Sequence, residues 1–208
     1  AHETQEPEGV VAGNLKATMS LLVVILVSAI AVYAVLLAPA SASVGRVSRR
    51  YALAGTAYFF LIGLGFMMVE IGTIQRMSIF LGHPVYSLAI VLFSLILLTG
   101  VGSFLSDYIR LDHRPARLVG YALVLSALLA SSALLAPTLL HSFEPADLPT
   151  RALVAIGLIA PAALLMGFGF PVGMALAGRI DSTPTPWFWS VNGAAGVFGS
   201  GVAVLISM

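Results

Sequence analysis

The sequence contains no cysteine and few charged residues. Without cysteine, its 208 residues form no disulfide, thiolate nucleophile or cysteine metal site. Charged residues make up 9% of the chain and hydrophobic residues 59%, whereas a typical soluble domain is about 25% charged. The net charge of +1 provides no basic field that would attract nucleic acid, so none is expected as a partner. A chain this apolar needs lipid as its solvent, and the lipid bilayer is the first partner we expect.

The apolar residues lie in continuous runs, each close to the roughly 20 residues that a membrane helix needs. Since every backbone group in lipid must be satisfied within its own segment, helices are the expected structure. The sequence predicts an all-α fold, a polytopic transmembrane bundle of about six helices over residues 19–208. The predicted spans are Met19–Ala38, Ala52–Ile71, Tyr86–Ser106, Leu118–Leu135, Ala152–Ala175 and Phe188–Met208.

The first 18 residues are different, because they are polar and lack apolar periodicity. We expect residues 1–18 to form a mostly irregular N-terminal tail or linker. The connections at 41–50, 107–117 and 179–186 hold most of the Lys and Arg residues. The positive-inside rule places these three connections in the cytoplasm and both termini outside. A half-helix missed at a break around residues 71–80 would invert part of this topology.

Polar side chains gather at the end of the second predicted span, where Glu70, Gln75, Arg76 and His83 follow one another. Burying an acid is costly, roughly 2.5–3.5 kcal/mol for Asp at the centre of a membrane helix. One interpretation makes Glu70 a brace between helices, paired with Arg76 or with a group on another helix. The other makes it a proton or cation site, or a handle for a polar ligand. We favour the brace, because no span contains a second acid that would form a relay.

His83 stands between Gly82 and Pro84, in a pattern that ends one helix and begins the next. We expect His83 to cap a helix terminus or to titrate near neutral pH. A metal site needs three or four convergent ligands, and the other histidines fall in unrelated connections. We therefore predict no metal and no cofactor.

The fifth predicted span contains Pro161 and Pro171, each of which removes a backbone donor and tends to kink a helix. Gly169, Gly173 and Ala177 recur at every fourth position. Such a stripe of small residues favours close approach of a neighbouring helix. A broken helix that lines a polar cavity, as in transporters, is the alternative interpretation.

In the sixth predicted span, Asn192, Gly196 and Ser200 recur at every fourth position on one face. An amide in the membrane needs a partner. We expect Asn192 to bond to a facing helix, near Glu70, although the predicted topology puts these two residues toward opposite membrane surfaces.

Three stretches resemble the C-terminal membrane region of bacterial spermidine synthase-like membrane proteins. They read VEIGTIQRMSIFLGHPVYSLAIVLFSLILLTGVGSFLSD, MGFGFPVGM and PWFWSVNGAAGVFGS. The similarity covers about residues 52–208. It is carried by two blocks, one with Glu70, Gln75, Arg76, Leu81, Gly82, His83, Pro84 and Tyr86, the other with Trp187, Trp189, Asn192, Gly193 and Ala194.

The resemblance implies a soluble aminopropyltransferase-like domain joined to membrane helices, in the bacterial cytoplasmic (inner) membrane. The Gly-rich turn and the acidic residues of that catalytic domain have no counterpart in this chain, so the resemblance implies the membrane part only. We expect a non-catalytic membrane module, an anchor or accessory subunit whose partners are other membrane subunits or a missing soluble domain. The alternative is a small transporter or solute-binding bundle for a cationic molecule such as a polyamine.

Overall fold

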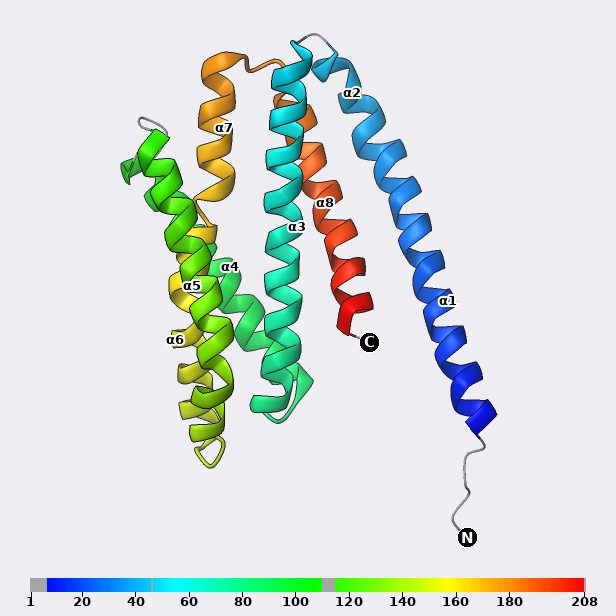
Figure 1. Ribbon diagram of the computed structural model, residues 1–208, viewed down its shortest axis with the longest axis vertical. Coiled ribbons are helices and arrows are strands. Elements are labelled where there is room, and N and C mark those ends of the chain that lie inside the picture. Colours follow the sequence, from blue (N-terminus) through cyan, green and yellow to red (C-terminus); the bar gives the residue numbers. More distant parts are fainter. Residues whose placement is uncertain (1–6, 46, 110–114, 208) are drawn as a thin grey trace.

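The computed structural model describes residues 7–45, 47–109 and 115–207, and within these ranges the chain is helical and has no strand (Figure 1). The elements follow one another with short connections. They are α1 (Pro7–Val32), the π-helix η1 (Tyr33–Leu37), α2 (Ala38–Val44), α3 (Arg49–Phe80), α4 (Pro84–Ile109), α5 (Pro115–Ser142), α6 (Leu148–Met166), α7 (Gly169–Ile180) and α8 (Thr185–Ser207).

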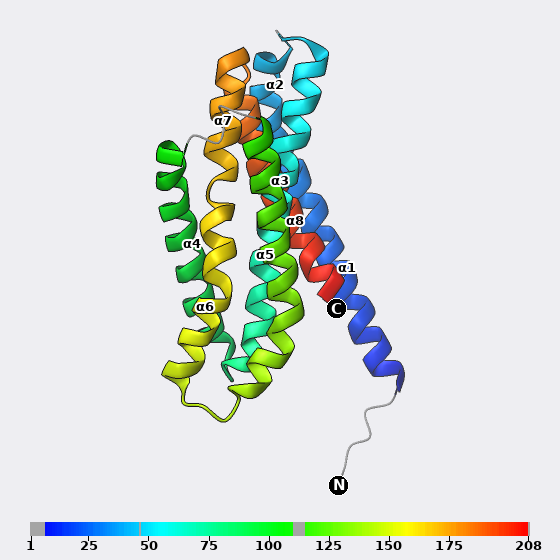
Figure 2. The ribbon, with the colours of Figure 1, turned by 60° about the vertical axis from the view of Figure 1, so that its left-hand side comes forward.

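Within the described ranges, five stretches are long and apolar enough to cross a membrane: 49–80, 84–109, 116–142, 148–180 and 185–206. The stretch Thr18–Val32 of α1 is a shorter apolar helix. The prediction of an all-α transmembrane bundle with about six helices is confirmed, and the chain is an integral membrane protein. Helices α3, α5 and α8 begin at one end of the bundle, whereas α4 and α6 begin at the other (Figures 1 and 2).

Three details differ from the sequence-based expectations. Helix α1 begins at Pro7, so the irregular tail expected up to residue 18 is helical from that point; residues 1–6 lie outside the described residues. The predicted fifth span is two helices, α6 and α7, because the helix is interrupted at Gly167 and Phe168. Helix α3 is continuous to Phe80, so the break that would invert the topology near residues 71–80 is absent from it.

Helices α3 and α8 make the most extensive contact in the bundle, followed by α4 with α6 and α3 with α4. Helix α5 packs mainly on α6, and α1 packs mainly on α8. Figure 2 shows α5 running beside α6. This arrangement leaves α3 and α5 on two sides of a space that is also lined by α6 and α7.

Two clusters of buried side chains hold the bundle together. One joins α3 to α4, α5 and α6 around Met77, Leu95 and Ile159. The other joins α3 to α7 and α8 around Phe59 and Phe188, whose rings stack with centroids 5.0 Å apart. Helix α3 belongs to both clusters and is the central element of the fold.

Candidate functional site

Tyrosine hydroxyls bind α3 to the stripe of small residues on α7. Tyr58 donates to the carbonyl of Gly169 at 2.6 Å, and the hydroxyl of Tyr51 lies 2.8 Å from the carbonyl oxygens of Ala177 and Asp181. A Cβ atom added to Gly173 would overlap the ring of Tyr58. The small residues therefore let α3 approach α7 closely, and backbone carbonyls of α7 accept hydrogen bonds from the tyrosine hydroxyls of α3.

A second set of bonds joins α8 to α3. The Nδ2 of Asn192 donates to the carbonyl of Phe59 at 3.1 Å, and the Nε1 of Trp187 donates to the hydroxyl of Thr56 at 2.7 Å. Further along α8, a Cβ atom at Gly196 would lie 3.6 Å from the Cγ of Met67. Asn192 thus bonds to a facing helix, as the sequence suggests.

The acid Glu70 is far from that bond. Glu70 stands eleven residues after Phe59 on α3, about 16 Å further along a helix that rises about 1.5 Å per residue, so the structure does not bring Asn192 and Glu70 together. Glu70 is half-buried, and Gln75 is exposed one turn beyond it. Neither residue lines any of the three cavities described below.

His83 ends the connection between α3 and α4. Its Nδ1 accepts a hydrogen bond from the backbone N–H of Val85 at 3.2 Å, and its ring meets the edge of Tyr86 with centroids 5.7 Å apart. Gly82 before it has a φ of 79°, a left-handed conformation that favours glycine. His83 therefore caps the first turn of α4, where Pro84 is the first residue.

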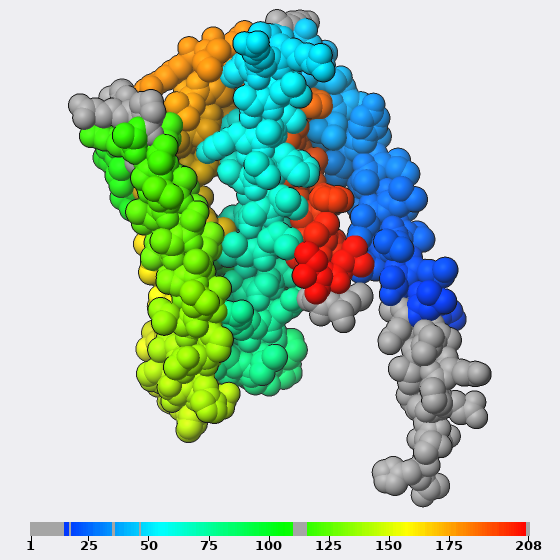
Figure 3. Space-filling model, viewed as in Figure 1, coloured from blue at the N-terminus to red at the C-terminus, as the bar shows by residue number. Residues whose placement is uncertain are grey.

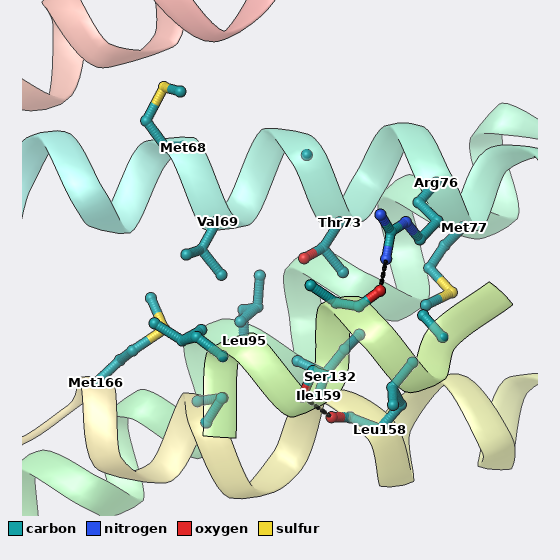
Figure 4. A pocket seen from close by; sticks show the side chains of 16 residues that line it. Met68, Val69, Thr73, Arg76, Met77, Leu95, Ser132, Leu158, Ile159 and Met166 are labelled. Carbon is teal, nitrogen blue, oxygen red and sulfur yellow. Dashed lines mark hydrogen bonds between the residues drawn. The ribbon is translucent and has the colours of Figure 1, made fainter. Parts of the chain in front are cut away.

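Arg76 lines a cavity of about 250 Å³ that lies between α3, α5 and α6 (Figure 4). Its Nη1 donates to the carbonyl of Ala133 on α5 at 3.3 Å. On the opposite wall, Ser132 donates to the carbonyl of Leu158 at 3.4 Å. Arg76 therefore bonds across the space to α5 instead of turning back to Glu70 within its own helix.

A second cavity, of about 470 Å³, continues from the first along α3. The two share Val69, Leu129 and Met166 in their linings, and we call the pair the α3–α5 cleft. Figure 3 shows the surface hollowed between α3 and α5. The second cavity is lined by α3, α5, α7 and α8, including Ile62, Gly65, Phe170, Asn192 and Gly196.

A third cavity, of about 480 Å³, is separated from the cleft by α3 and lies between α1 and α8. We call it the α1–α8 groove. Its lining is mainly aliphatic and aromatic, with Trp187 and Thr56 at one end. Among the described residues, no charged one lines it, which distinguishes it from the α3–α5 cleft with Arg76.

The two prolines of the predicted fifth span lie on either side of the break between α6 and α7. Pro161 is inside α6, and Pro171 is in the first turn of α7. At the break itself, a Cβ atom added to Gly167 would overlap the backbone of Thr99 on α4. The interruption therefore lies where α4 packs closely against the chain.

Sequence reasoning missed three polar contributors, which are Arg151, Tyr58 and Tyr121. Arg151 donates through Nη1 to the carbonyl of Phe80 at 3.0 Å, which ties α6 to the end of α3, while its Nε is buried without a partner among the described residues. Tyr121 donates to the carbonyl of Leu165 at 2.9 Å. A tyrosine in the middle of an apolar run is the signal that points to such bonds, because its hydroxyl needs an acceptor when buried.

Within the described parts of the chain, no three His, Asp or Glu side chains gather to hold a metal ion. Comparisons with protein-family models, with curated proteins and with solved structures find no match to this chain. The fold and the bonds described above define a polytopic α-helical membrane protein.

Proposed function

We propose that this chain is a non-catalytic membrane module, acting as an anchor or as an accessory subunit of a larger membrane assembly. The observation that supports it most is the use made of polar side chains inside the bundle. Asn192, Trp187, Tyr51, Tyr58 and Tyr121 all bond between helices. Such bonds hold helices in one arrangement, and these side chains are used for that purpose.

The scaffold formed by these bonds suits a structural role. Aromatic packing strengthens it, because Phe59 contacts the rings of Tyr58, Phe170 and Phe188 at once. Aromatic pairs in such geometries contribute roughly 0.5–1.5 kcal/mol each beyond their buried area. A rigid helical block of this kind is what an anchor needs to hold an attached domain or subunit at a fixed position.

The test is the composition of the protein in its own membrane. The tagged chain is extracted from native membranes with a mild non-ionic detergent, and the mass of the complex that it forms is measured by native mass spectrometry. We expect a complex of defined stoichiometry and a mass above the 21.7 kDa of this chain. A strictly monomeric, partner-free protein of that mass, obtained also after crosslinking in the intact membrane, would contradict the proposal.

Transport of a cationic solute such as a polyamine is the second candidate. The broken helix α6–α7 beside a cavity favours it, since transporters place binding sites at discontinuous helices. The charge of the cleft opposes it, because the charged residue in the lining is Arg76 and not Glu70. Uptake of labelled polyamine into proteoliposomes, with Glu70→Gln as the control, separates the two functions. Flux abolished by this substitution would favour transport.

A further inference from the structure

The α3–α5 cleft combines an apolar interior with one positively charged side chain, Arg76, at its end. Its first cavity is lined by aliphatic residues and methionines, with Arg76 as the charged group and Thr73 and Ser132 as polar neighbours. Toward the middle of the bundle, the described residues that line the second cavity are all uncharged. The chemistry therefore changes from cationic to apolar along α3.

The size of the cleft suits a slender ligand. Small-molecule pockets occupy roughly 300–1,000 Å³, and the two connected cavities measure about 250 and 470 Å³. Their lining on α3 runs from Leu61 to Met77, which is about 24 Å at a rise of about 1.5 Å per residue. One leaflet of a hydrocarbon core of about 30 Å is about 15 Å deep, so an acyl chain fits within this length.

Two glycines, Gly65 and Gly72, leave gaps between the side chains on the α3 wall of the cleft. A Cβ atom added to Gly65 or to Gly72 would meet nothing within 4 Å, so these glycines do not serve close packing with a neighbouring helix. They stand two turns apart on the same face. The space beside them is open, and it lies in the part of the bundle that lipid surrounds.

We propose that the α3–α5 cleft binds an anionic membrane lipid, with an acyl chain along Gly72 and Gly65 and the phosphate at Arg76. Arg76 is exposed and uses Nη1 for the carbonyl of Ala133. A guanidinium has five N–H donors in a planar fork that matches a phosphate, so donors remain for a headgroup. The unbranched methionines Met77 and Met166 supply walls that adapt to a flexible chain.

The experiment compares two lipids that share their acyl chains and phosphate but differ in the rest of the headgroup, so that one is anionic and the other zwitterionic. The whole protein is delipidated in a neutral detergent and titrated with 1-palmitoyl-2-oleoyl phosphatidylglycerol or with the matching phosphatidylcholine. Bound lipid is counted by native mass spectrometry. We expect tighter binding of phosphatidylglycerol. Arg76→Gln should weaken that binding about ten-fold, the effect of losing one charge-assisted hydrogen bond. It should weaken phosphatidylcholine binding less, because the choline cation already offsets the charge of the phosphate that faces Arg76.

Matched variants separate the cleft from the general surface. Arg50→Gln removes an exposed arginine at the other end of α3 and should leave binding unchanged. Gly72→Leu fills the first cavity and should weaken the binding of both lipids. Gly100→Leu is its control: it adds the same side chain on α4, where a Cβ atom also meets nothing within 4 Å, and it should leave the binding of both lipids unchanged. Helical circular dichroism verifies that each variant is folded.

Two outcomes overturn the proposal. One is phosphatidylglycerol binding that Arg76→Gln and Gly72→Leu leave at the wild-type level. The other is a cleft that takes no lipid while Gly72→Leu releases a protein subunit from the native complex, which would assign the cleft to a partner helix. Neither outcome decides whether the chain is a non-catalytic module, because that proposal is tested by the composition of the native complex.

Discussion

Helix α3 uses glycine in opposite ways on two of its faces. On the face toward α8, a Cβ atom at Gly63 would lie 2.5 Å from the backbone oxygen of Asn192, and one at Gly55 would overlap the ring of Phe188. On the face toward α5, Cβ atoms at Gly65 and Gly72 would meet nothing within 4 Å. The first face is closed by a neighbouring helix, and the second borders the α3–α5 cleft.

The difference shows that a small residue in a membrane helix has two structural uses. Toward α8 it lets two backbones approach, so that Asn192 reaches the carbonyl of Phe59. Toward α5 it leaves room that the protein itself does not fill. A larger side chain should therefore have opposite effects on stability at the two faces. It would clash with α8 on the first face, whereas the second face has room for it.

The largest effect that tests this comparison is expected for Gly63→Leu. The new side chain would collide with Asn192 and Ala195, and overpacking of this kind costs typically 1–3 kcal/mol. We expect a loss of about 3 kcal/mol, since the bond to Phe59 is displaced as well. Unfolding by SDS in mixed micelles, followed by circular dichroism, measures it. The comparison fails if Gly65→Leu is destabilised as strongly.

The next effect is expected for Asn192→Leu, which keeps the branched shape of the side chain and removes the amide. Hydrogen bonds between membrane helices contribute about 0.6 kcal/mol on average and at most about 1.7 kcal/mol, and we expect a loss of stability in this range. Ser190→Ala is the control, because the Ser190 hydroxyl bonds to Pro186 within its own helix. Equal losses in the two variants would show that the α3–α8 face does not depend on the amide.

The elements of the fold follow from local signals in the sequence. Each predicted span is an uninterrupted apolar run, and the start of α4 at Pro84 follows from the Gly–His–Pro pattern. The beginning of α1 at Pro7 does not follow in this way. Nucleating a helix is costly and extending it is not, so an apolar run that has become helical can extend into the polar segment before it. The apolar periodicity used to predict helices does not reveal such an extension.

The hydrogen-bond acceptors and the α3–α5 cleft, in contrast, could not be predicted from the sequence. Asn192 could be predicted to need an acceptor, but the acceptor is the backbone carbonyl of Phe59, and every residue has a carbonyl. The α3–α5 cleft is equally hidden, because it results from the packing of α5 on α6 instead of on α3. Glycines at Gly63 and Gly72 look alike in the sequence, and only the distance to the neighbouring helix distinguishes them.

A smaller effect, of opposite sign, is expected for Gly72→Ala. Glycine inside a helix costs roughly 0.5–1 kcal/mol relative to alanine, and the added methyl group meets nothing within 4 Å. We expect a gain of about 0.5 kcal/mol in the same SDS titration. Gly102→Ala is the contrasting variant, because its Cβ atom would overlap the backbone of Leu164. A loss of stability in Gly72→Ala would mean that something occupies the cleft tightly.

The smallest effect lies outside both faces of α3, at the start of α6. Hydrogen bonds from the side chain and backbone N–H of Thr150 hold the pKa of Asp147 below its ordinary 3.8. Because the folded-state pKa is depressed, the stabilising contribution is present above 3.8 and is lost as the pH falls through the lower folded-state value. Asp147→Asn keeps a capping side chain that does not titrate. Thermal unfolding should therefore show a constant difference between the two proteins at pH 5–7 and a change below about pH 4. The same difference at every pH would mean that the carboxylate adds nothing to the cap.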